Sequence, residues 1–243
     1  MPLYLQIYDL LREKIDTGVF LPKTQIPTEV ELSQEYHVSI ITVKQAIKKL
    51  VAEGLLYRKQ GKGTFVCSPR VNRKLNRLLS FNAEMLQKGM VPSTRLLDVH
   101  EAVPRKSVAE QLQLSGDSRV IVVKRLRLAD DEPLAVQTSY IPQSLCPTLT
   151  EKRNALSGSL YELLLDEYGL VASSGRESYS AVIVSGPDAG LLDVPEGSPA
   201  FAVKRLAFLA EGNPVEYVES LLRGDRYSLD VELRSPDSAV PGR

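Results

Sequence analysis

The sequence predicts an α+β protein with two modules: a three-helix module with a two-stranded hairpin, and a duplicated α/β unit that forms one mainly antiparallel sheet. Three observations predict this fold class. Residues 1–67 contain three apolar patterns with helical spacing and one hairpin pattern. The chain beyond residue 78 repeats itself with an offset of about 80 residues. Charge divides at the same place, with a net +6 in residues 1–77 and −6 in residues 78–243.

The composition is that of an ordinary globular protein, with 43% hydrophobic and 25% charged residues. Its longest apolar runs are far shorter than the ~20 residues that a membrane-spanning helix needs, so we expect a cytoplasmic protein without a membrane partner. The sequence has two cysteines and two histidines, and their spacing is not that of a metal or catalytic site. They are Cys67, Cys146, His37 and His100. We therefore expect no metal, no cofactor and no catalytic residue.

The first two helices are predicted by apolar spacing and capping signals. Residues 3–15 carry helical apolar spacing, and Gly18 ends this helix. Thr28, followed three residues later by Glu31, forms a capping box that opens a short second helix ending near Tyr36.

A third helix begins at Ser39 and ends at Gly54, with one apolar stripe between them. Its opposite face is polar and basic, and shows Ile40, Thr42, Lys44, Gln45, Lys48 and Lys49. Two short helices joined by a tight turn, the second with such a face, are typical of a helix-turn-helix whose recognition helix enters the major groove of DNA. Residues 55–66, two strand-like pieces around Gly61-Lys62-Gly63, predict a hairpin wing behind it.

These patterns carry a resemblance across residues 2–66. The matching segments are Pro2-Leu3-Tyr4 with Gln6-Ile7, Ile26-Pro27-Thr28-Glu29, Val38-Ser39, Thr42-Val43-Lys44-Gln45-Ala46, Leu50, Glu53-Gly54-Leu55-Leu56 and Gly61-Lys62-Gly63-Thr64-Phe65-Val66. They resemble the DNA-binding domain of the GntR regulators, which implies a double-stranded operator as partner. A structural three-helix bundle would leave the wing unexplained.

The chain departs from that family where arginines usually read guanines, because it has Val30, Ile40 and Lys44 there. Ile40 offers only apolar contact, for instance to a thymine methyl, so the operator is expected to differ from the usual one. A weakened DNA-binding domain is the alternative, and the remaining basic residues argue against it. The residues expected to contact DNA are Thr28, Ser39, Ile40, Thr42, Lys44, Gln45, Lys48, Arg58, Gly61, Lys62 and Gly63.

The rest of the chain divides into a linker, a duplicated domain and a tail. Residues 68–78 are basic and lack a period, which predicts a linker between a DNA-binding domain at 1–67 and a second domain at 79–234, with a flexible tail at 235–243. In the duplication, residues 123–126 match residues 203–206. Each copy predicts a serine-capped helix, a strand, a short helix and a hairpin, which makes about six strands in all.

The second domain also carries a family resemblance. The segments that carry it include Leu79-Ser80-Phe81, Arg125-Leu126-Arg127, Pro133, Ser139-Tyr140-Ile141-Pro142, Ser159-Leu160-Tyr161, Pro214-Val215-Glu216-Tyr217 and Arg223-Gly224-Asp225-Arg226-Tyr227. They resemble the UTRA domain, the effector-binding module of the HutC subfamily of GntR regulators, which implies a chorismate-lyase-like fold and dimerisation through this domain.

Strand alternation puts Arg125 and Arg127 on one face, where two neighbouring cations repel unless an anion compensates them. The resemblance implies a phosphate site made of Ser80, Phe81, Arg125, Arg127 and Ser159. The alternative is that both arginines form structural ion pairs with Glu177, Glu216 or Glu219.

Two positions in this expected site depart from the sugar-phosphate-sensing members of the subfamily. Gln137 replaces a usual glutamate and Leu222 a usual tyrosine, while Glu216 remains as a polar partner. The changes favour a less hydroxylated anion, so the expected effector is a sugar phosphate, a phosphonate or an organic acid.

The sequence therefore predicts a homodimeric transcriptional regulator, a repressor, that reads an inverted repeat and responds to a small anionic effector. The competing hypothesis is a chorismate-lyase-like enzyme carrying an accessory DNA-binding domain. It is disfavoured by the absence of catalytic spacing among histidine, cysteine, serine and aspartate. A DNA-packaging protein is disfavoured because the second domain is net acidic.

Overall fold

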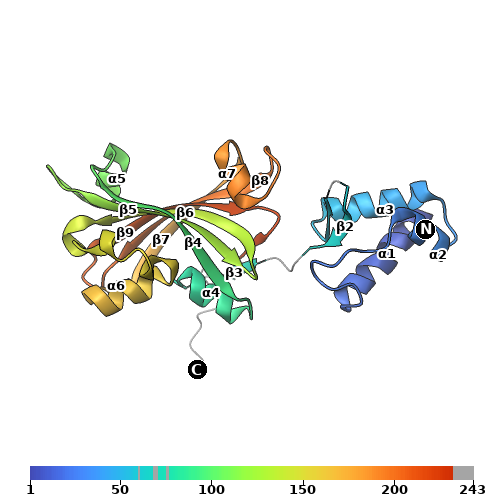
Figure 1. Cartoon of the computed structure of the whole chain (residues 1–243), viewed down its shortest axis with the longest axis horizontal. Helices are drawn as coiled ribbons and strands as arrows, with labels where there is room; N and C mark the ends of the chain where they lie inside the picture. The colour runs from blue at the N-terminus through green and yellow to red at the C-terminus, as the bar shows by residue number, and fades with distance from the viewer. Residues whose placement is uncertain (60, 68–70, 75–76, 232–243) are drawn as a thin grey trace, which may run out of the picture. The chain divides into compact units, whose positions relative to one another are not determined.

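A computed structural model describes residues 1–59, 61–67, 71–74 and 77–231. The chain forms two compact units, Met1–Arg70 and Val71–Arg243, and each is described by itself (Figure 1). In the described ranges no helix is both long enough and apolar enough to cross a membrane.

The first unit has three helices and a hairpin, as the sequence predicts. Its elements are α1 (Leu3–Asp16), α2 (Glu29–Glu35), α3 (Ile40–Ala52), β1 (Leu56–Lys59) and β2 (Gly63–Val66). The apolar stripe of α3 packs with α1 and α2 around Leu11 and Leu32, both fully buried. Strands β1 and β2 pair antiparallel, so the predicted wing is confirmed.

Capping side chains fix where α2 and α3 begin. The backbone N–H of Glu31 donates to the Thr28 hydroxyl, while the Glu31 carboxylate accepts from the Thr28 backbone N–H at 2.7 Å, which completes the predicted capping box. The Ser39 hydroxyl accepts from the backbone N–H of Thr42. The start of the recognition helix is therefore set by sequence signals rather than by packing alone.

The second unit contains one six-stranded sheet. Copy one supplies α4 (Phe81–Gln87), β4 (Pro92–Ala102), α5 (Lys106–Gln111), β5 (Val120–Ala129) and β6 (Glu132–Pro142). Copy two supplies α6 (Leu160–Tyr168), β7 (Ser174–Ile183), α7 (Pro187–Leu192), β8 (Pro199–Phe208) and β9 (Pro214–Arg223), with three short 3-10 helices, Gln143–Leu145, Leu149–Glu151 and Ala155–Ser157, between the copies.

The strand order β4-β5-β6-β9-β8-β7 is that of two three-stranded meanders joined through β6 and β9. All five neighbouring pairs are antiparallel. This arrangement confirms the predicted duplication and the antiparallel sheet. Helices α4 and α6 cover one face of the sheet, and α5 and α7 cover the other (Figure 1).

The linker prediction needs a correction at residues 71–74. These residues form β3 (Val71–Lys74), which pairs in parallel with β10 (Tyr227–Asp230) near the end of the domain. Val71 is buried beside Tyr227, and the Asn72 side-chain amide donates to the Asp230 carboxylate at 2.6 Å. This part of the linker therefore belongs to the second unit, whereas residues 68–70 and 75–76 and the predicted tail 235–243 lie outside the described residues.

Candidate functional site

The DNA-facing candidates lie on the outer side of α3. Lys44, Gln45 and Lys48 are exposed, and Ile40 retains 39% of its accessible surface. Lys49 differs, because its ammonium sits 4.2 Å from the centre of the Tyr8 ring and serves the contact between α3 and α1. The outer face of α3 is thus a mixed basic and aliphatic surface, available for contact with bases and phosphates.

The other predicted DNA contacts surround this helix. The hydroxyls of Thr28 and Ser39 cap α2 and α3, and Thr42 lies within 2.8 Å of the Ser39 hydroxyl. Arg58, on β1, forms a 2.9 Å ion pair with Glu29 and stays half exposed.

At the wing tip, Lys62 is exposed between two glycines with positive φ, Gly61 at 70° and Gly63 at 121°. A Cβ at Gly63 would also meet the end of the flexible Gln25 side chain, but the positive φ is the stronger constraint. Glycine at this position is therefore required for the tight turn that presents Lys62.

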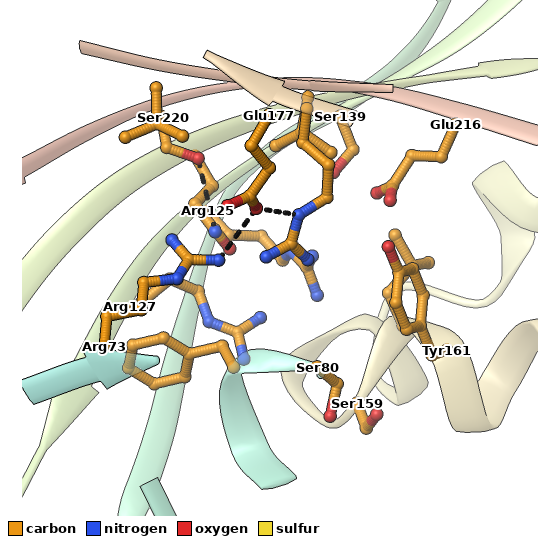
Figure 2. Close-up of a pocket in the computed structure, with 16 residues that line it drawn as sticks. Arg73, Ser80, Arg125, Arg127, Ser139, Ser159, Tyr161, Glu177, Glu216 and Ser220 are labelled. Atoms are coloured by element: carbon orange, nitrogen blue, oxygen red, sulfur yellow. Dashed lines mark hydrogen bonds and ion pairs between the residues drawn. The ribbon is translucent and has the colours of Figure 1, made fainter. Parts of the chain in front are cut away.

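A pocket lies on the face of the sheet that α4 and α6 cover, and both copies line it (Figure 2). Its charged lining residues are four arginines and two glutamates, namely Arg73, Arg125, Arg127, Arg205, Glu177 and Glu216. Its other lining residues include Ser80, Phe81, Gln137, Ser139, Ser159, Tyr161 and Ser220. The pocket therefore combines an excess of positive charge with several hydroxyl groups.

Arg125 and Arg127 are buried side by side on β5, with 4% and 2% of their surface exposed. Nε and Nη1 of Arg125 and Nε of Arg127 have no hydrogen-bond partner within the described ranges, while Nη2 of Arg127 donates to the Asn82 amide oxygen at 2.5 Å. The predicted alternative of ion pairs with Glu177, Glu216 or Glu219 is wrong, since no carboxylate of the described chain lies within 4.0 Å of either guanidinium.

Burial, and then the charge of Arg125, lower the pKa of Arg127 to about 8. Burial likewise lowers the pKa of Arg125. The charge of Glu216 raises the pKa of both arginines without outweighing burial, and no carboxylate of the described chain lies within ion-pair distance, so an anion bound beside these guanidiniums would stabilise them.

The other two arginines are already paired. Glu177 accepts from Nη2 of Arg73 at 2.9 Å and forms a very short contact with Nε of Arg205. Arg205 also donates to the backbone carbonyl of Leu79 at 3.2 Å. Burial works against ionisation of Glu177, yet Arg205 and Arg73 together hold its pKa below the usual value. Glu177 thus joins the strand formed by the supposed linker to the wall of the pocket (Figure 2).

Polar groups complete the pocket. The hydroxyls of Ser80 and Ser159 accept from backbone N–H groups of Ala83 and Glu162, at 3.1 and 3.3 Å, and cap α4 and α6 at the pocket (Figure 2). The Ser139 hydroxyl is buried and has no hydrogen-bond partner among the described residues. The Gln137 amide donates to the Ser220 hydroxyl at 3.3 Å, and Glu216 is 2% exposed.

The structure brings together every predicted effector-site residue except Leu222. Leu222 is 2% exposed and packs in an apolar cluster with Met85 and Ala135, so it does not line the pocket. Alternation along β9 puts Leu222 on the same face as the lining residues Glu216, Val218 and Ser220, but Leu222 lies one step beyond them and packs with Met85 of α4. Among the residues of the described chain, no cluster of His, Cys, Asp and Glu could hold a metal ion.

Sequence reasoning missed Arg73, Tyr161, Glu177 and Arg205. For two of them a signal was present, since the offset of about 80 residues matches Phe81 with Tyr161 and Arg125 with Arg205. Arg73 had no such signal, because its place depends on pairing between β3 and the distant strand β10.

Residues 3–66 match the family model described as bacterial regulatory proteins, gntR family, and residues 87–228 match the UTRA domain. The chain is 33% identical to the HTH-type transcriptional repressor NagR of Bacillus subtilis, over 94% of this chain and 93% of that protein. It is 32% identical to the probable fructoselysine utilization operon transcriptional repressor of Escherichia coli K12, over 95% of this chain and 94% of that protein.

Solved structures support the fold. The crystal structure of PhnF from Mycobacterium smegmatis superposes with a TM-score of 0.66 at 21% identity, over 94% of this chain and 99% of that one. The relatives of this chain are transcriptional regulators and not enzymes, so the enzyme hypothesis is not supported.

Proposed function

The chain belongs to the gntR family of bacterial regulatory proteins and carries a UTRA domain, and from this premise we propose that it represses transcription until a small anion binds the pocket beneath α4 and α6. Its role as a DNA-binding transcriptional regulator follows from the family. Repression, the anionic effector and the contacts that each residue makes are the proposal.

One observation carries the anionic effector. Arg125 and Arg127 are buried next to each other with unsatisfied guanidinium nitrogens and no carboxylate in ion-pair range among the described residues. Leaving a buried charge unpaired costs several kcal/mol, whereas phosphate and carboxylate oxygens match the guanidinium fork. The pocket therefore fits a ligand whose anionic end lies against β5.

The rest of the lining favours a hydroxylated ligand. Leu222, one of the two positions that favoured a less hydroxylated anion, lies in the apolar core and not in the pocket. Glu216, Ser139 and Tyr161 line the remainder of the pocket and can hydrogen-bond to hydroxyls. The names of relatives refer to fructoselysine utilization and to mannosyl-D-glycerate transport and metabolism. Of the three expected classes, a sugar phosphate therefore fits best, ahead of a phosphonate or an organic acid.

Arg73 supplies the connection from this pocket to the DNA-binding unit. It belongs to β3, which begins directly after the last residue of the first unit, and its guanidinium shares Glu177 with Arg205. An anion that attracts Arg205 or Arg73 competes with Glu177 for the same donors. Ligand binding would then change how firmly β3 is held, which is the differential interaction that coupling to DNA affinity requires.

The proposed regulator is a homodimer that reads an inverted repeat. A single helix-turn-helix covers few base pairs, and two copies related by a two-fold axis read two half-sites. Sedimentation of the full chain is expected to give a dimer at micromolar concentration. A monomer that stays monomeric on operator DNA would contradict this part of the proposal.

Operator release tests the proposal as a whole. Duplexes selected by the full chain serve as operator, and fluorescence anisotropy follows release by sugar phosphates, phosphonates, organic acids and the matching neutral sugars. We expect release by an anion only. Arg125→Ala and Arg127→Ala should keep operator affinity within about twofold, because both residues belong to the second unit. Both variants should no longer release the operator when the anion is added, which removes a coupling energy of typically about 1–3 kcal/mol.

Arg73→Gln separates binding of the effector from its transmission. This variant should still bind the anion through Arg125 and Arg127, but release less operator at saturation. Release by a neutral sugar in wild type and all three variants would contradict both the anionic effector and the coupling route.

A further inference from the structure

Two isoleucines begin the recognition helix without a role in the core. Ile40 and Ile41 are the first two residues of α3, and they retain 39% and 70% of their accessible surface. The apolar positions of α3 that are buried inside the unit are Val43, Ala46, Ile47 and Leu50, each at most 1% exposed. Ile41 thus points away from the core, and it is absent from the outer face that the sequence pattern suggested.

Helical spacing places Ile41 in line with two polar residues. Gln45 follows one turn later and Lys48 a further turn on, and both are exposed. Lys44 is exposed beside them. The outward stripe of α3, Ile41, Gln45 and Lys48, therefore presents an aliphatic group, an amide and an ammonium in that order along the helix.

The polar groups at the same helix start are already in use. The Ser39 hydroxyl accepts from the Thr42 backbone N–H at 3.2 Å, and it lies 2.8 Å from the Thr42 hydroxyl. These two hydroxyls satisfy each other and the helix cap. Among the side chains of the first turn, the two isoleucines are therefore the exposed ones that take no part in the cap, and they lie beside the backbone N–H groups that a helix start leaves free.

The chemistry of the major groove limits what isoleucine can read. In a helix-turn-helix, the N-terminal residues of the recognition helix contact the base edges. Isoleucine has neither a hydrogen-bond donor nor an acceptor, and the apolar feature of base edges in this groove is the thymine methyl. Glutamine matches the N6 and N7 pattern of adenine, while flanking lysines complement the phosphates.

From this placement we infer that the outward stripe of α3 selects A·T base pairs, with Ile41 and Ile40 packing on thymine methyls and Gln45 bonding to adenine. The inference rests on the DNA-binding part of the proposed function and is independent of the effector. It assigns Ile41, one turn before Gln45, a reading role next to that of the glutamine.

Removing the thymine methyl tests this assignment directly. The full chain first selects half-sites from randomised duplexes without effector. Each thymine in the selected half-site is then replaced singly by deoxyuridine, which keeps base pairing but lacks the methyl. At a fixed salt concentration, wild type should lose about fourfold in affinity at one or more positions, the value expected for one buried methyl.

The isoleucine variants should lose that sensitivity. Ile41→Ala should bind the thymine duplex about fourfold more weakly than wild type, and bind the deoxyuridine duplex no more weakly than the thymine duplex. Ile40→Ala is expected to do the same at a neighbouring position. Leu10→Ala is the matched control, because Leu10 is 42% exposed on α1 and should keep the wild-type response.

Three results would overturn the inference. They are selected half-sites without a preferred thymine, equal affinity for thymine and deoxyuridine duplexes, or a methyl effect that persists undiminished in Ile40→Ala and Ile41→Ala. A chain that enriches a half-site but ignores its methyls contradicts this inference alone. A chain that enriches no half-site contradicts the DNA-binding role as well.

Discussion

The two copies in the second unit carry the same arginine in different electrostatic surroundings. Arg125 on β5 and Arg205 on β8 occupy equivalent positions of the duplication, and both line the pocket. On the neighbouring strand, Arg205 is paired in register with Glu177, whereas Arg125 is paired with Leu96. Arg205 therefore has a carboxylate partner, and Arg125 has unsatisfied nitrogens.

Arg205 is therefore a structural cation, whereas Arg125 is a buried cation with unsatisfied nitrogens that face the pocket. A cross-strand carboxylate satisfies Arg205, which holds β8, β7 and, through Arg73, the linker strand together. A cross-strand leucine leaves Arg125 to be satisfied from the pocket. Duplication placed one guanidinium in each copy, and the residue opposite it on the neighbouring strand decides whether it has a carboxylate partner.

Breaking the ion pair between Arg205 and Glu177 should have the largest effect on stability. Arg205→Met leaves Glu177, whose side chain is 19% exposed, with Arg73 as its remaining guanidinium, so we expect the free energy of unfolding to fall by about 3 kcal/mol in urea denaturation. Arg176→Met is the matched control, because Arg176 is an exposed neighbour of Glu177 on β7. Its change should stay within about 0.5 kcal/mol. Equal losses in the two variants would remove the contrast between the copies.

Removing the unpaired cation should act in the opposite direction. Arg125→Met replaces a buried guanidinium that has no ion-pair partner among the described residues by an apolar side chain of similar length. We therefore expect the free energy of unfolding without ligand to rise by about 1–2 kcal/mol. A clear loss of stability in Arg125→Met would mean that Arg125 is a structural residue like Arg205.

Converting one copy into the other sharpens the comparison. Leu96→Glu places a carboxylate opposite Arg125, as Glu177 stands opposite Arg205. An internal carboxylate should compete with external anions and weaken phosphate binding at least about tenfold, which corresponds to about 1.4 kcal/mol. Leu96→Gln has nearly the same shape without the charge and controls for packing. The account fails here if both variants bind phosphate as wild type does.

The smallest effect is a pH dependence. The pKa of Glu177 is below its ordinary value in the folded chain, so its contribution to stability is present above about pH 4.5 and is lost as the pH falls through the folded pKa. Wild type should lose about 1 kcal/mol more than Glu177→Gln between pH 5 and pH 3. Parallel acid unfolding curves for the two chains would show that Glu177 is not held as an ion pair.

Most of the fold could be predicted from the sequence. The adjacent arginines of copy one could be predicted as well, but not the residues opposite them on the neighbouring strand. Caps such as Ser39 and Ser159, and the alternation that places Arg125 beside Arg127, are local signals that tertiary structure rarely overrides. The register that sets Leu96 opposite Arg125 was out of reach, because β4 is shifted by an irregularity between Leu96 and Asp98. The neighbours of an arginine on another strand depend on such long-range details.

The two wrong predictions, for Arg73 and Leu222, also arose because strand pairing and strand position depend on long-range structure. Arg73 looked like one of several basic linker residues, because nothing local shows that Val71–Lys74 pairs with Tyr227–Asp230. The resemblance placed Leu222 in the pocket, where subfamily members usually have a tyrosine, whereas its strand position buries it in the apolar cluster.

The central claim is that the unpaired arginines of copy one bind the anion. Isothermal titration of inorganic phosphate into the full chain tests it most directly, with Arg125→Met and Arg127→Met in parallel and a neutral hexose as the second ligand. We predict that phosphate binds wild type, that each variant loses at least about tenfold in affinity, and that the hexose alone binds much more weakly than phosphate. Phosphate affinity unchanged in both variants, or a neutral sugar that binds all three chains equally well, would contradict the claim.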